Sequence, residues 1–192
     1  AHSNLGLALK GQGKLEQAIA AYQRALQIDP NIAIAHSNLG LALKGQGKLE
    51  QAIAAYQRAL QIDPNFANAH YNLGLALYAQ GKLEEAIAAY QRALQIDPNF
   101  ANAHNNLGIA LKGQGKLEQA IAAYQRALQI DPNIAIAHNN LGIALKGQGK
   151  LEQAIAELEI AVSLDPSNTL FRKNLEIYKN KNNGFLKRLF GG

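Results

Sequence analysis

The chain has 192 residues, of which 48% are hydrophobic and 17% charged, and its formal net charge is +5. The apolar share excludes an intrinsically disordered chain, and the lack of cysteine excludes disulfides, thiolate metal sites and cysteine nucleophiles. No apolar run approaches the roughly 18 residues of a membrane-spanning helix, and no secretory signal opens the sequence, which favours the cytoplasm without fixing the compartment.

An internal repeat of 34 residues organises the chain, and a period of that length indicates a solenoid or a related repeat architecture. Residues 1–31 and 35–65 are identical. We divide the chain into five units followed by a capping helix and a basic amphipathic tail: 1–32, 33–66, 67–100, 101–134, 135–168, then 169–182 and 183–192.

Each unit predicts two helices joined by a glycine-rich turn. In 33–66, helical spacing relates the apolar residues of the first helix: Ala35, Leu39, Ala42 and Leu43. The Gly45–Gly47 turn follows, since glycine is costly inside a helix and cheap in a turn. A second stripe of Ala52, Tyr56, Ala59 and Leu60 ends before Pro64, because proline disfavours the helical conformation of the preceding residue. One hairpin cannot bury its stripe alone, so stacking predicts an all-α solenoid.

The same unit carries a family motif made of His36, Leu39, Gly40, Leu43, Ala52, Tyr56, Ala59 and Pro64. In spacing and period this motif resembles the tetratricopeptide repeat, from residue 1 to about residue 181. The resemblance implies a right-handed α-solenoid of stacked helix-turn-helix repeats that acts as a protein-interaction scaffold. Three positions depart from the family pattern: His36 replaces Trp, Leu43 replaces Tyr and Tyr56 replaces Phe.

Polar residues of the repeats recur with their surroundings copied, whereas an active site needs one asymmetric constellation. Five histidines share one repeat position: His2, His36, His70, His104 and His138. Equivalent residues of stacked hairpins lie roughly 10 Å apart, while zinc needs each nitrogen at about 2 Å, so packed histidines are favoured over a metal ladder. We expect no enzyme, no cofactor and no metal site.

A second stripe on the first helices is unexplained by stacking. Leu41 lies about 200° from Leu39 around the helix, and Asn38 and Gly45 lie near it. Concave surfaces lined by one helix series are where solenoids bind partners, so the stripe predicts the floor of a peptide-binding groove. The candidate binding residues are Asn4, Asn38, Asn72, Asn106, Asn140, Leu41, Leu75, Ile109, Tyr71, Tyr78, Lys44, Lys112 and Lys146.

The asparagine ladder is similar to that of superhelical peptide-binding arrays such as the arm of O-GlcNAc transferase. That resemblance implies that the asparagines hold the main chain of a protein or peptide ligand, and the lysines favour a ligand with acidic residues. The alternative is structural, with each asparagine bonding a neighbouring helix, and one amide can serve both roles. Binding of chaperone tails is disfavoured because the basic clamp residues of that subfamily are missing, as at Leu41 and Asn68.

The charge is concentrated at one end of the sequence. Residues 169–192 hold six of the 19 basic side chains but one of the 14 acidic ones, so they carry the whole +5. A capping helix is predicted at 169–182, with Leu170, Phe171, Leu175 and Tyr178 as its buried stripe. Two alternative functions stay open: end-to-end self-assembly through residues 1–32, and an adaptor acting through the tail. Nucleic acid is not expected as a partner, and membrane contact through 183–192 would be weak.

Overall fold

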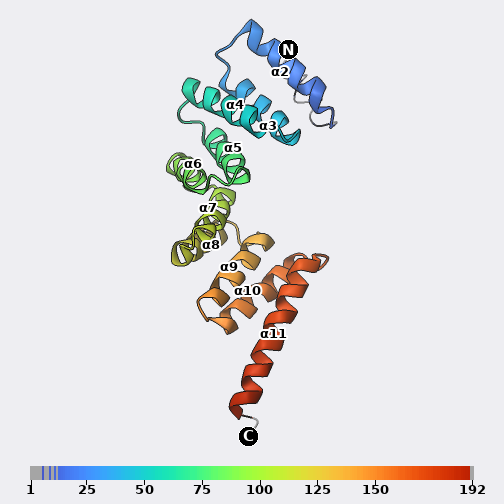
Figure 1. The fold of residues 1–192 in the computed structure, drawn as a ribbon, viewed down its shortest axis with the longest axis vertical. Coiled ribbons are helices and arrows are strands. Elements are labelled where there is room, and N and C mark those ends of the chain that lie inside the picture. Colours follow the sequence, from blue (N-terminus) through green and yellow to red (C-terminus); the bar gives the residue numbers. More distant parts are fainter. Residues whose placement is uncertain (1–5, 7–8, 10, 12, 191–192) are drawn as a thin grey trace. The chain divides into compact units, whose positions relative to one another are not determined.

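The computed structural model describes Gly6, Leu9, Gly11 and residues 13–190, with side chains as far as Asn182. Regular structure within this described part is helical, without a strand (Figure 1). None of its helices is long and apolar enough to cross a membrane. The chain divides into two compact units, residues 1–98 and 99–192.

Two complete helical hairpins make up most of the first compact unit. Its helices are α2 (Leu15–Ile28), α3 (Ala33–Gly45), α4 (Leu49–Ile62), α5 (Ala67–Ala79) and α6 (Leu83–Ile96). Helices α3 and α4 pack as one hairpin and α5 and α6 as the next, while α2 packs on α3 and α4 packs on α5. Each second helix thus also contacts the first helix of the following repeat, as stacking predicts.

The second compact unit repeats this arrangement and ends on a longer helix. Its helices are α7 (Ala101–Gly113), α8 (Leu117–Ile130), α9 (Ala135–Gly147), α10 (Leu151–Leu164) and α11 (Thr169–Phe190). Helix α8 packs on α9 and α10 packs on α11, so α11 occupies the place of a further first helix. The predicted all-α solenoid of helix-turn-helix repeats is confirmed.

The turn within each hairpin depends on one glycine. Gly47 has φ of +75°, a left-handed conformation that favours glycine. With this turn, the backbone N–H of Lys48 donates to the carbonyl of Leu43 and closes the end of α3. The same geometry recurs at four further positions: Gly13, Gly81, Gly115 and Gly149.

In four of the repeats a tyrosine of the second helix packs against a glycine of the first helix, and in the last repeat Leu158 takes the place of the tyrosine. The Tyr56 side chain is 0% exposed, and a Cβ added to Gly40 would lie 2.6 Å from its Cε1 atom. Equivalent pairs are Gly6 with Tyr22, Gly74 with Tyr90, and Gly108 with Tyr124. The glycine is therefore required by ring packing rather than by backbone conformation.

Helix α11 docks through a mixed apolar and polar side. Phe171 and Tyr178 are buried as predicted, and Leu175 is half-buried. The prediction for Leu170 was wrong, because this side chain is 54% exposed. It precedes Phe171 by one residue, hence by about 100° of rotation, and falls on the flank of the helix. The helix also continues to Phe190, past residue 182 where the sequence analysis ended it.

Candidate peptide-binding surface

The second stripe of the first helices is accessible in both compact units. The stripe residues Leu41, Leu75 and Ile109 are half-buried, whereas Ala42 and Leu43, next to Leu41 in the chain, are buried. The stacking core therefore leaves part of these three side chains exposed. Asn4, the first residue of the predicted ladder, lies outside the described residues.

Helix α5 differs from the other first helices because it adds two tyrosines to this stripe. Tyr71, Leu75 and Tyr78 are spaced by four and three residues, which places them on one face of the helix. The Tyr71 ring lies 6.1 Å from the ring of buried Tyr90, with the two planes tilted by 47°. Tyr78 is 39% exposed. On this face the Tyr71 ring is packed against Tyr90, whereas the Tyr78 ring is exposed to solvent.

The ladder asparagines have different surroundings in the two compact units. In the second unit, Asn140 Nδ2 donates to Asn105 Oδ1 at 3.1 Å, between α9 and α7. In the first unit, Asn72 has no side-chain hydrogen bond to any described residue, and the position equivalent to Asn105 is Ser37. A serine hydroxyl sits on a shorter stem than an asparagine amide. Asn140 thus bonds a neighbouring helix, as the structural alternative predicts. The half-buried amide of Asn72 makes no such bond among the described residues and is left for a ligand.

A second asparagine pair links α11 to α9. Asn174 Nδ2 donates to Asn139 Oδ1 at 2.9 Å. The two bonded pairs have the same sequence separation of 35 residues. In both pairs a side-chain amide of one first helix donates to the amide oxygen of an asparagine in the first helix before it, which is the structural alternative of the sequence analysis.

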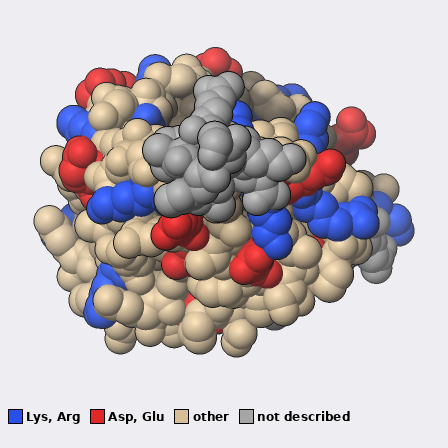
Figure 2. All heavy atoms as spheres, turned by 90° about the horizontal axis from the view of Figure 1, so that it is seen from below, with Lys and Arg blue, Asp and Glu red and all other residues tan. Residues whose placement is uncertain are grey.

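The predicted lysine row is only partly open to a ligand. The Lys146 ammonium lies 5.6 Å from the centre of the Tyr178 ring of α11, a cation–π contact within the chain. Lys112 is half-buried, and desolvation lowers the pKa of its ammonium group. Lys44 is half-buried on α3. In the end view of Figure 2, basic and acidic side chains of the described residues are interspersed.

The recurring histidines serve the connection between repeats. Nε2 of His36, His70 and His138 donates to a proline carbonyl at 3.0 Å in each case. This bond satisfies a turn carbonyl that no helix pairs. Burial is the main influence on His70 and lowers its pKa, and the bond to Pro64 partly opposes that effect.

One cleft recurs in both compact units and was not predicted from the sequence. In the first unit it measures about 340 Å³, and its residues include Leu60, His70, Leu73, Ala89 and Arg92. In the second it measures about 420 Å³ and is lined by Gln125, Leu128, Gln129, His138, Leu141 and Glu157. Glu157 replaces an alanine of the other units and places its Oε2 atom 2.6 Å from His138 Nδ1.

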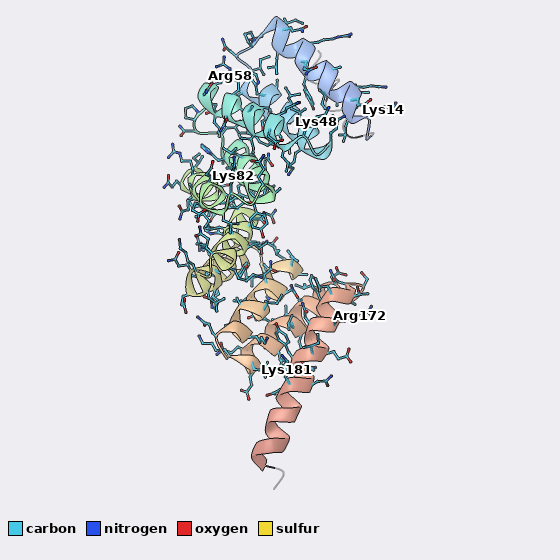
Figure 3. The ribbon with its side chains drawn as sticks, viewed as in Figure 1. Lys14, Lys48, Arg58, Lys82, Arg172 and Lys181 are labelled. Carbon is cyan, nitrogen blue, oxygen red and sulfur yellow. The ribbon has the colours of Figure 1, made fainter. Side chains whose placement is uncertain are left out.

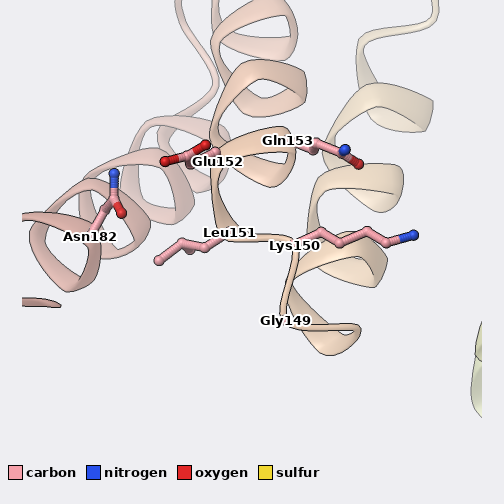
Figure 4. A pocket seen from close by; sticks show the side chains of 6 residues that line it. All are labelled: Gly149, Lys150, Leu151, Glu152, Gln153 and Asn182. Carbon is pink, nitrogen blue, oxygen red and sulfur yellow. The ribbon is translucent and has the colours of Figure 1, made fainter. Parts of the chain in front are cut away.

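A second kind of cleft lies where α2 and α10 begin. Near α10 it measures about 460 Å³, and Figure 4 shows Leu151 pointing toward Asn182 of α11. Its counterpart in the first compact unit, near Lys14, measures about 320 Å³. Both are lined by the residues around the left-handed glycine, so this cleft follows from the repeat turn itself.

Family profiles match most of the chain. The profile described as TPR repeat matches residues 6–47, 43–81, 74–115 and 112–149, and the profile described as tetratricopeptide repeat matches residues 135–168. The chain belongs to the tetratricopeptide repeat family. No curated protein sequence matches it.

Solved structures with the same fold include several tetratricopeptide repeat proteins. The crystal structure of MamA is 28% identical, covers 84% of this chain and 94% of its own, and superposes with a TM-score of 0.78. YrrB, described as a TPR protein with an unusual peptide-binding site, is 25% identical over 90% of this chain and 89% of its own, with a TM-score of 0.74. PilF of Pseudomonas aeruginosa is 25% identical over 100% and 91%, with a TM-score of 0.82.

Proposed function

We propose that this tetratricopeptide repeat chain is a protein-interaction scaffold that binds an extended peptide segment along its first helices. Helix α5 is the principal contact. The observation that carries the proposal is the side-chain amide of Asn72, which has no hydrogen bond to a described residue and lies beside the partly exposed Tyr71, Leu75 and Tyr78. The peptide-binding site named for the similar YrrB is in keeping with this proposal.

The chemistry of this face suits a peptide main chain. A side-chain amide offers two donors and one acceptor, so Asn72 can pair with a peptide group whatever residue carries it. Leu75 and the two tyrosine rings offer apolar surface to the ligand side chains. Aromatic residues often dominate interface energies, whereas one net hydrogen bond contributes about 0.5–1.5 kcal/mol. Tyr71 and Tyr78 are therefore expected to contribute more affinity than Asn72.

The ladder residues of the second compact unit contribute less in this proposal. Asn140 already donates to Asn105, and Lys146 already faces the Tyr178 ring. A ligand would have to replace these contacts. An acidic residue in the ligand would gain from the half-buried Lys112, and that contribution would weaken with salt.

Selection from a displayed library of random peptides, followed by binding measurements on variants, tests the proposal. Peptides selected on the wild-type chain should bind Tyr78→Ala and Asn72→Ala more weakly, the former by the larger factor. Asn31→Ala is the matched control, because Asn31 is exposed in a turn and its backbone N–H, which alanine keeps, donates to Asp29 Oδ1. Helical circular dichroism should be the same for all four proteins. Equal binding by Asn72→Ala, Tyr78→Ala and the wild type would place the site elsewhere.

Self-association is a second candidate, favoured by Ile28 on α2, which is 73% exposed. An apolar side chain of this size that faces solvent within the predicted association segment 1–32 suits contact with another copy. Light scattering over a range of concentrations should show dimers for the wild type and fewer for Ile28→Ser. Monomers throughout would remove this candidate.

A further inference from the structure

Several contacts determine which side of α11 faces the protein. Phe171 and Tyr178 are buried, and Asn174 donates to Asn139 of α9. On another side, the Lys179 ammonium lies 2.6 Å from the Glu159 carboxylate of α10. These contacts leave the flank of α11 that begins at Leu170 without a covering helix among the described residues.

That flank carries alternating apolar and basic side chains, which we call the α11 stripe: Leu170, Lys173, Ile177 and Lys181. At about 100° per residue these four positions fall within about 80° around the helix. Leu170 is 54% and Ile177 40% exposed, and both lysines are exposed without an ion-pair partner among the described residues. Glu176 lies about 60° beyond Lys173 and is the only carboxylate on α11.

We propose that the α11 stripe docks this chain on an anionic lipid surface. An interfacial helix places apolar side chains at the acyl boundary and basic ones among the head groups. Lysine suits this arrangement because its aliphatic stem can lie along apolar surface while the ammonium reaches the head groups. The wider segment 169–192 holds six basic side chains against Glu176, so its charge is complementary to acidic lipid.

Helix α11 is longer than the first helices of the complete repeats, and its added part is basic in sequence. First helices of the complete repeats have 13 residues, whereas α11 has 22, or about 33 Å of helix. The added turns contain Lys187 and Arg188 in the sequence. A nucleic-acid backbone would use the lysines but would gain nothing from Leu170 and Ile177. Dependence on these two apolar residues therefore separates the two anionic partners.

Co-sedimentation of the full chain with vesicles tests the proposal. We expect binding to phosphatidylserine–phosphatidylcholine vesicles, little binding to phosphatidylcholine alone, and weaker binding at high salt. Each basic side chain near such a surface contributes about fivefold, so Lys173→Gln with Lys181→Gln should lower the partition coefficient about 25-fold. Leu170→Ser with Ile177→Ser should also lower it.

The matched control is Lys48→Gln with Lys82→Gln, which makes the same change in net charge. Both lysines are exposed in the turns before α4 and α6 and are labelled, like Lys181, in Figure 3. This control should bind nearly as well as the wild type. Equal loss in the control, equal binding to both vesicle types, or binding insensitive to the serine variants would overturn the proposal. The proposal would also be overturned if deleting residues 183–192 abolished vesicle binding while Lys173→Gln with Lys181→Gln left it unchanged.

Discussion

Replacing Gly40 by alanine should destabilise the first compact unit, although alanine is the better helix former. The added Cβ would lie 2.6 Å from Cε1 of Tyr56 and 2.9 Å from Cδ1 and Cζ. Carbon atoms attract best at about 3.5–4.0 Å, so the ring or the helix must move by about 1 Å. The Tyr56 side chain is 0% exposed, hence no adjacent solvent can accept the displaced ring.

Two opposing effects set the magnitude. Exchanging glycine for alanine inside a helix contributes about 1 kcal/mol of stability, whereas overpacking a filled core costs about 1–3 kcal/mol. The overpacking is expected to exceed the gain, because three ring atoms of Tyr56 lie within 2.9 Å of the added carbon. We expect a net loss of about 1 kcal/mol for Gly40→Ala.

Urea unfolding followed by helical circular dichroism measures this loss. The matched control is Gly45→Ala on the same helix, where the nearest heavy atom is Cδ1 of Leu15 at 3.1 Å, the far end of a flexible side chain. Its midpoint should equal or exceed that of the wild type. Adding Tyr56→Leu should relieve part of the Gly40→Ala clash, because at the corresponding Gly142 an added Cβ would lie 3.0 Å from Cγ of Leu158, farther than the 2.6 Å to the tyrosine ring. The double variant should lose less stability than the two single losses combined.

A Gly40→Ala midpoint at or above that of the wild type would refute the reasoning. So would strict additivity with Tyr56→Leu, since the proposed clash is a pairwise effect. Nearest-neighbour coupling spreads a local loss through a repeat array. The midpoint of the whole transition is therefore the quantity to compare.

Three further outcomes follow from the core and the turns. Burial raises the pKa of the Tyr56 hydroxyl far above its usual value of 10. The stability that the neutral Tyr56 contributes is therefore fully present below about pH 10 and falls as the pH rises above it. Parallel titrations of tyrosinate absorbance and of helical circular dichroism should show ionisation and unfolding together. Gly47→Ala should cost about 1–2 kcal/mol in urea unfolding, because alanine is disfavoured at its φ of +75°. Asn174→Ala should cost about 1–3 kcal/mol by leaving the amide oxygen of buried Asn139 unpaired, and exposed Asn180→Ala should cost little on the same helix.

The sequence predicted the hairpins well because their boundaries are set by local chemistry. The α3–α4 turn needs a left-handed residue, which Gly47 supplies, and α4 ends before Pro64. Both signals lie within a few residues of the boundary they determine. Because the same signals recur in every repeat, predicting the helices of one repeat was enough to predict the fold class.

Features that depend on another repeat were harder to predict. Asn140 donates to Asn105, 35 positions earlier, whereas the residue 35 positions before Asn72 is Ser37, and nothing within a single repeat indicates this difference. The end of α11 also escaped prediction, because the asparagines around residue 182 and Gly184 favour a turn. The exposure of Leu170 depended on how α11 rotates to bury Phe171, which the spacing alone did not fix.

Near-identity of the repeats makes their departures the informative positions. A structural role within the repeat is enough to explain a residue that is present in every unit. His70, for example, donates a hydrogen bond to the carbonyl of Pro64. Tyr71 and Tyr78 stand at positions where the other described first helices carry polar or basic residues, so the hairpin common to the repeats does not explain them. In the same helix the Asn72 amide is unbonded among the described residues, whereas Asn140 is bonded. Aromatic surface and a spare amide thus coincide on α5, and this coincidence rather than the ladder as a whole supports a ligand contact there.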